Sequence, residues 1–172
     1  MRKLITGAVL TLLLASISAV PAMAETTIDE SQAPQGAHIS KGTPNCFLLP
    51  GNVTVQCGSV TIVGIGKTNA TTTLSAVYSA TFDCLDESGN VVTSVREPTQ
   101  TATGQPSPEN GRITTPILRS SVPSGEDFIA DGGVSCPGGT TPQIVPDSLT
   151  VDSFTYTVSF DGFTGNYIKI TV

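Results

Sequence analysis

The residues best suited to chemistry in this chain are four cysteines, a single histidine and two groups of acidic residues. No two cysteines have the C-x-x-C spacing that is typical of zinc sites and thiol redox centres. His38 has no serine or cysteine nucleophile motif beside it, and a hydrolase triad needs an imidazole held rigidly against its nucleophile. We therefore predict no enzyme activity, no catalytic residue, no cofactor and no metal.

The acidic residues leave alternatives open. They gather around two turns, one with Asp83, Asp86 and Glu87 and the other with Glu126, Asp127 and Asp131. Hard oxygen ligands on a loop can hold Ca²⁺, and two carboxylates can hydrolyse a glycosidic bond. We interpret both groups as solvated turn acids and keep a weak calcium-binding module as the alternative, with a carboxylate-dependent hydrolase behind it.

Gly66-Lys67-Thr68 has the ending of a phosphate-binding loop but lacks its beginning. The motif requires glycine at position 61, which is threonine here. It also requires a following helix, whereas the residues after Thr68 have the period of a strand. The sequence therefore predicts no nucleotide site.

Phe163, in the turn DGFTGN, is the aromatic residue that we predict to be exposed for binding. Stacking surfaces for sugars or single-stranded nucleic acid use several exposed rings. Strand parity directs most aromatic residues inward. Those that parity leaves outside are Phe47, Phe128, Phe163 and Tyr167.

Residues 1–24 have the organisation of an export signal. Arg2 and Lys3 precede the apolar run Leu4–Val20, and Ala22-Met23-Ala24 forms a cleavage site before Glu25. Cleavage would change the formal net charge from -6 to -8, since -6 minus the two lost cations is -8. We expect a secreted, extracellular protein with no membrane span, and an acidic chain without basic runs does not favour nucleic acid.

The four cysteines predict two disulfides in an oxidising compartment. A hairpin with a four-residue loop, Pro50–Val53, places Cys46 opposite Cys57 as a non-hydrogen-bonded pair, whose Cα atoms approach to about 4.5 Å. This spacing suits a disulfide. We therefore predict Cys46–Cys57 and, with it, Cys84–Cys136, although four cysteines allow three pairings.

A two-residue period indicates strands throughout the chain. Thr71–Cys84 predicts one long strand, and Leu149–Phe160 predicts a second with a phase change at Ser153; another phase change follows Cys57. Shorter strands are expected over Val91–Val95, Ile113–Leu118 and Asp127–Cys136, and in a terminal strand that buries Ile168, Ile170 and Val172. This pattern predicts an all-β protein, an immunoglobulin-like two-sheet β-sandwich in a single domain over residues 42–172.

Two polar segments are expected to lie outside the regular strands. Residues 25–41 should form a flexible polar lead-in, and residues 96–111 a long surface connection with one edge strand. Asn52 and Asn69 begin glycosylation sequons, which matter if the host glycosylates exported proteins.

The pattern is similar to a loosely defined group of small exported bacterial proteins of unassigned function. The features that carry the similarity are Cys46 and Cys57 around a hairpin, the Val-Gly-Ile-Gly-Lys turn, the Thr-rich strand that ends at Cys84 before Gly89-Asn90, the Pro/Gly-flanked Cys136 and a Thr/Val strand pair near the end. The similarity covers roughly residues 46–160. It implies a disulfide-bonded, Thr-rich, immunoglobulin-like sandwich and no activity.

We therefore expect a non-enzymatic secreted β-sandwich that acts as an extracellular surface, matrix or binding module. An open edge at Tyr167–Val172 would let it pair with itself or with another cell-envelope protein. The alternative is a secreted inhibitor of an extracellular enzyme that uses the loop at residues 96–111.

Overall fold

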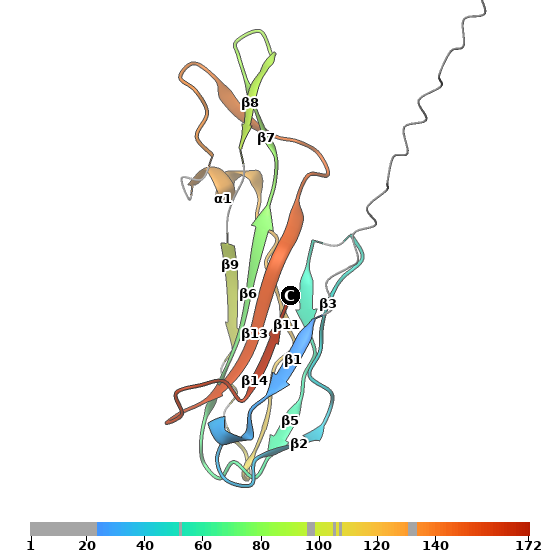
Figure 1. The fold of residues 1–172 in the computed structure, drawn as a ribbon, viewed down its shortest axis with the longest axis vertical. Helices are drawn as coiled ribbons and strands as arrows, with labels where there is room; N and C mark the ends of the chain where they lie inside the picture. The colour runs from blue at the N-terminus through green and yellow to red at the C-terminus, as the bar shows by residue number, and fades with distance from the viewer. Residues whose placement is uncertain (1–23, 52, 96–98, 105, 107, 131–133) are drawn as a thin grey trace, which may run out of the picture.

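The computed structural model describes residues 24–51, 53–95, 99–104, 106, 108–130 and 134–172, and within these ranges the chain is all-β apart from a 3-10 turn and one short helix. The described strands form small antiparallel sheets, one of five strands and three of three strands (Figure 1). In chain order the elements are β1 (Glu25–Ile28), η1 (Glu30–Gln32), β2 (His38–Lys41), β3 (Cys46–Leu48), β4 (Val55–Cys57), β5 (Thr61–Val63), β6 (Ala70–Ser79), β7 (Phe82–Leu85), β8 (Val91–Val95), β9 (Thr99–Gly104), β10 (Arg112–Thr114), β11 (Leu118–Arg119), α1 (Gly125–Ala130), β12 (Thr141–Ile144), β13 (Thr150–Phe160) and β14 (Ile168–Thr171). No helix in the described ranges is long and apolar enough to cross a membrane.

The five-stranded sheet has the order β1-β14-β13-β6-β9. Its two longest strands, β6 and β13, pair over their whole length. In β6 and in the second half of β13 buried side chains alternate with half-buried ones, so one face of the pair packs in the core. The pairing shifts by one residue between Val151 and Ser153. This bulge confirms the phase change predicted at Ser153.

Two three-stranded sheets, β10-β5-β2 and β11-β4-β3, use successive stretches of the same three chain segments. Between them the chain bends after Cys57, and the predicted phase change is confirmed because Cys57 and Val60 are both buried. Pairing continues beyond the strands as assigned: Thr115 N donates to Val60 O at 2.9 Å beside the bend, and Ser120 N donates to Val55 O at 2.9 Å at the start of β4. Apolar side chains of these strands and of the five-stranded sheet form one core cluster.

Serine and threonine hydroxyls complete the backbone hydrogen bonding at the start of β4 and just before β5. Val55 N donates to Ser120 Oγ at 2.9 Å, and Val60 N donates to Thr115 Oγ1 at 2.9 Å. The hydroxyl of Tyr78, from β6, crosses the core to Ser120 Oγ at 2.5 Å. A side-chain link therefore joins the five-stranded sheet to the start of β4, where an unpaired buried N–H would be costly.

Both disulfides have the predicted partners. Cys46 lies directly opposite Cys57 in the β3–β4 ladder, with Cα atoms 4.1 Å apart. Leu49 N donates to Thr54 O at 2.8 Å, which closes the loop at the predicted residues. Cys84 of β7 is bonded to Cys136, 52 residues along the chain.

The long strand predicted over Thr71–Cys84 is wrong in one respect. The predicted parity is confirmed, because the inward set from Leu74 to Cys84 is buried. However, β6 ends at Ser79, and β7, which begins at Phe82, belongs to a separate sheet of order β12-β7-β8. The strand breaks because Thr81 leaves the β13 ladder: its N–H donates to Ser148 Oγ and its carbonyl accepts from Val145 N.

The strand predicted over Asp127–Cys136 is also wrong, since residues Gly125–Ala130 form α1. Ser124 N donates to Asp127 Oδ2 at 2.7 Å, and Asp127 N donates back to Ser124 Oγ at 3.3 Å. This reciprocal capping is a known way to start a helix. It also brings Phe128, which parity left outside, into the core against Phe82 with ring centroids 5.4 Å apart.

The irregular lead-in predicted for residues 25–41 contains two strands instead. β1 pairs with β14 and β2 pairs with β5. All four side chains of β1 are exposed, so backbone hydrogen bonds rather than apolar periodicity hold it in place. The expected open edge at Tyr167–Val172 is therefore wrong, because β14 lies between β1 and β13.

Burial at the end of the chain agrees only in part with the prediction. Ile168 and Ile170 are buried as expected, whereas Val172 is 37% exposed. Tyr167, which parity left outside, is buried and packs on Phe160 with ring centroids 5.6 Å apart.

Candidate functional site

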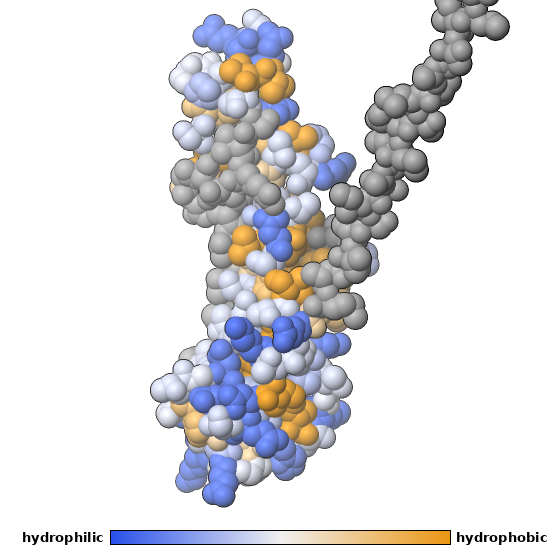
Figure 2. Space-filling view, in the orientation of Figure 1, coloured by the Kyte–Doolittle hydropathy of each residue, from blue (hydrophilic) through white to orange (hydrophobic). Residues whose placement is uncertain are grey.

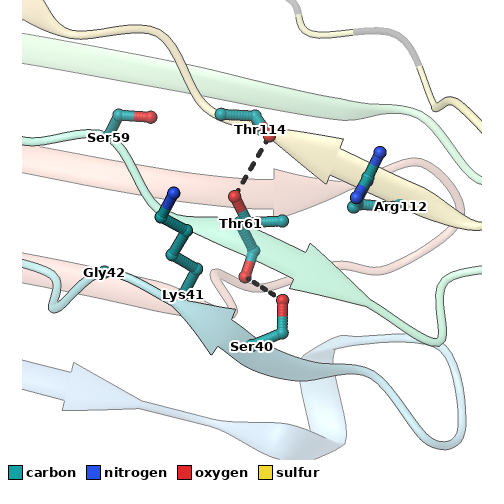
Figure 3. A pocket seen from close by; sticks show the side chains of 7 residues that line it. All are labelled: Ser40, Lys41, Gly42, Ser59, Thr61, Arg112 and Thr114. Carbon is teal, nitrogen blue, oxygen red and sulfur yellow. Dashed lines mark hydrogen bonds between the residues drawn. The ribbon is translucent and has the colours of Figure 1, made fainter.

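A candidate site in the described part of the chain is a shallow groove on the outer face of the β10-β5-β2 sheet, with a volume of about 600 Å³ (Figure 3). Its lining residues come from three segments that are far apart in the sequence. They are Ser40, Lys41, Gly42, Ser59, Thr61, Arg112 and Thr114. Alternate residues of a strand face opposite sides of the sheet. The neighbouring row of paired residues therefore faces the core: Ile62 and Ile113 are buried in it, and Ile39 packs against it.

A register shift in β2 brings two consecutive residues to the groove. Ile39 pairs with Ile62 and Lys41 pairs with Thr61, so Ser40 is the extra residue of a β-bulge. Bulges commonly redirect a side chain in this way. Ser40 and Lys41 therefore both line the groove, although neighbours in a regular strand would face opposite sides.

Gly42 follows the bulge in a conformation and at a distance that a larger residue would not tolerate. Its φ is +83°, and a Cβ built there would lie 2.7 Å from the carbonyl oxygen of Ser59. The close backbone approach of Gly42 to Ser59 shapes this end of the groove, and any side chain at position 42 would push the two segments apart.

A row of hydroxyls forms the floor of the groove. Ser40 Oγ donates to the carbonyl oxygen of Thr61 at 3.3 Å, and the hydroxyls of Thr61 and Thr114 lie 3.1 Å apart in a hydrogen bond. These bonds run across all three strands, as Figure 3 shows with dashed lines. A hydroxyl can both donate and accept a hydrogen bond, so the floor can bind ligand oxygens that accept a hydrogen bond as well as ligand hydroxyls that donate one.

Two cations flank the row of hydroxyls. Figure 3 shows Lys41 on β2 and Arg112 on β10, with Thr61 between them on β5. Within the described part of the chain, neither cationic group has a hydrogen bond or an ion pair to a carboxylate. In a protein with a formal net charge of -6, this leaves a local positive site that is open to anions.

Phe163, the predicted binding residue, is not part of this groove. It lies in the turn between β13 and β14, where its N–H donates to Phe160 O at 3.2 Å, and its side chain is 36% exposed. None of the residues that line the groove comes from this turn. A role for Phe163 in binding stays a prediction.

The acidic turns are organised by their own hydrogen bonds. Asp86 Oδ1 accepts from Ser88 N and Asn90 N, both at 2.8 Å, and the bonds from Asn90 and then from Ser88 lower the pKa of Asp86 below its usual value. The backbone and hydroxyl of Ser124 lower the pKa of Asp127 in the same way. Asp131 lies outside the described residues, and within them no three acidic, histidine or cysteine residues are grouped as a metal site.

The remaining predicted features lie in or near strands. His38 is on β2, with Nδ1 at 2.9 Å from Gly36 O. Gly66-Lys67-Thr68 forms the turn before β6, so a strand follows it as predicted. Asn69 Nδ2 donates to Asp161 Oδ2 at 3.3 Å, while Asn52 lies outside the described residues.

The segment at residues 96–111 contains the predicted edge strand. β9 pairs with β6 from Thr99 to Gly104 at the border of the five-stranded sheet. A strand fixed in a sheet is a poor inhibitory loop, because an inhibitor needs a segment that stands clear of its scaffold. Residues 96–98, 105 and 107 lie outside the described ranges.

Sequence reasoning missed the groove because it assigned β2 to an irregular lead-in. The signal that could have indicated it is the alternation His38-Ile39-Ser40 together with two of the chain's eight cations, Lys41 and Arg112.

Comparisons of the chain with protein-family models, with curated proteins and with solved structures found no match. The functional interpretation therefore depends on the geometry of the groove.

Proposed function

We propose that the protein is a non-enzymatic, exported binding module whose groove takes anionic groups of an extracellular polymer. The observation that carries the proposal is the pair Lys41 and Arg112, which face a hydroxyl floor without carboxylate partners in the described chain. Arg can bind a carboxylate or a phosphate with two parallel hydrogen bonds, and Lys adds a point charge. The hydroxyls of Thr61 and Thr114 can then contact neighbouring sugar oxygens.

The strength of such a site sets the kind of ligand that fits it. An exposed ion pair contributes at most about 1 kcal/mol, so two cations hold a small anion only weakly. A polymer with repeated anionic groups binds many modules at once and gains from their effective concentration. We therefore favour a carboxylated or phosphorylated polysaccharide over a small molecule.

Export and a sandwich architecture belong to the same proposal. Two disulfides are typical of oxidising compartments outside the cytoplasm. The continuity of β2 with β3, of β5 with β4 and of β10 with β11 across the bend supports their interpretation as one curved second sheet of an immunoglobulin-like sandwich. A sandwich of this kind would present the groove on its outer face.

The test measures retention of the folded chain on immobilised polygalacturonate, with a neutral dextran as reference. The groove variant carries Lys41→Gln and Arg112→Gln, and the charge-matched control carries Lys169→Gln and Arg119→Gln, which also removes one lysine and one arginine. We expect the groove variant to bind about tenfold more weakly and the control to bind like the wild type. Equal retention of the two variants, or equal retention of the wild type on both matrices, would contradict the proposal.

A further inference from the structure

One end of the molecule carries an arm that the proposed function does not use. β7, the turn Asp86–Asn90 and β8 form a hairpin that extends from the body, at the end opposite to β2 and β5 (Figure 1). Cys84 anchors the arm through its disulfide to Cys136. The hairpin is therefore a fixed projection along the long axis of the molecule.

The tip of the arm is acidic, and apolar side chains lie directly beside it. Glu87 is exposed and forms no hydrogen bond or ion pair in the described chain, and the half-buried Asp86 before it accepts hydrogen bonds from Ser88 and Asn90. Val91 and Val92 follow the turn and are 57% and 53% exposed. Figure 2 shows hydrophobic surface directly beside the hydrophilic tip at this end.

The two ends of the molecule have complementary charges. The arm carries two carboxylates at its tip, while the groove carries Lys41 and Arg112 over a hydroxyl floor. The groove's volume of about 600 Å³ is large enough for the side chains of a turn. The two features lie at opposite ends of the molecule, so the arm and the groove of one copy do not meet each other.

The geometry points to head-to-tail self-association, in which the Asp86–Asn90 turn of one copy enters the Lys41–Arg112 groove of the next. This inference rests on the proposed function, since it names a second copy of the chain as one anionic partner of the same groove. Contact between unlike surfaces is heterologous, so it adds copies in a row unless the rotation between neighbours closes a ring.

The test uses two variants that each disable one end. The groove variant again carries Lys41→Gln and Arg112→Gln, and the arm variant carries Glu87→Gln, so that neither variant gains a charge that could bind the mutated end of the other. Glu87 is chosen over Asp86 because the Asp86 carboxylate holds the turn together through Ser88 and Asn90. All three substituted side chains are exposed, and circular dichroism checks that each variant is folded.

Sedimentation velocity at physiological salt, where the Debye length is about 8 Å, measures the outcome. We expect the wild type to form species that grow with concentration and each variant alone to stay monomeric. An equimolar mixture of the variants should form dimers and nothing larger, because it contains one working arm and one working groove per pair. A monomeric wild type at millimolar concentration, or unchanged association of the groove variant, would overturn the inference.

The two proposals fail in different ways. A wild type that binds polygalacturonate but stays monomeric would overturn the head-to-tail contact alone. A wild type that associates through arm and groove but is not retained by the polymer would overturn the polymer-binding role alone.

Discussion

The hydroxyl of Tyr78 on β6 donates a hydrogen bond to Ser120 Oγ, 2.5 Å away, just after β11. Ser120 Oγ in turn accepts from Val55 N at 2.9 Å. The two residues thus join the five-stranded sheet to the start of β4, in a region where both side chains are buried. A buried chain of this kind stabilises the fold when all of its members are paired.

Replacing Ser120 should destabilise the protein more than replacing Tyr78. Ser120→Ala leaves Val55 N–H without its acceptor inside the protein, which should cost about 2 kcal/mol, whereas Tyr78→Phe removes one hydrogen bond at about 1 kcal/mol. The double variant should lose less than the sum, because both single changes break the same bond. Urea unfolding measures all three, and changes below about 0.5 kcal/mol would show that the link contributes nothing.

Thr72 offers the opposite case. It is fully buried on β6, and its hydroxyl has no hydrogen bond within the described chain. Thr72→Val keeps the β-branched shape and removes a buried polar group, so the free energy of unfolding should stay equal or rise by about 1 kcal/mol. Thr115→Val is the matched control: its hydroxyl accepts from Val60 N, so this variant should be destabilised. A clear loss of stability in Thr72→Val would contradict the assignment.

Alkaline pH should unfold the protein through its tyrosines. Burial raises the pKa of Tyr78, Tyr156 and Tyr167, which are all of the tyrosines in the chain, and the charge of Glu30 raises that of Tyr167 further. A raised pKa contributes stability below the unfolded value of about 10, and this stability is lost as pH rises through the folded value. A spectrophotometric titration should show tyrosinate forming later in the folded protein than in denaturant. Coincident curves would contradict the burial.

The two disulfides should differ in their effect on stability. The chain-entropy relation gives about 3 kcal/mol for the loop closed by Cys46–Cys57 and about 4 kcal/mol for the longer loop closed by Cys84–Cys136. Paired Cys→Ala variants, compared by denaturant unfolding, should follow this order. Peptide mapping without reduction checks the pairing itself, and a Cys57–Cys84 peptide would contradict it.

Sequence reasoning succeeded where side chains on one face are buried. The alternation in β6 and β13 was visible because a half-buried strand must repeat every two residues. The Cys46–Cys57 bond followed from hairpin register, which the loop residues determine locally. Both are properties of neighbouring residues.

It failed where backbone pairing or a local cap decided the structure. β1 has no buried side chain, so no apolar pattern could reveal it. At α1, the Ser124–Asp127 cap outweighed a weak strand pattern that surrounds Phe128. The groove was missed for a third reason: its residues meet only when β2, β5 and β10 are assembled, and no short window of sequence contains them.

The bond between Cys46 and Cys57 clamps the β3–β4 hairpin below its tip. A protease that cut anywhere between residues 49 and 54 would therefore release no fragment, and the two new chain ends would remain tethered side by side. The same tether would keep the two strands in register if a foreign peptide were spliced into the tip. This hairpin is thus a natural place to insert a label or an epitope, at the far side of the bend from the Lys41–Arg112 groove.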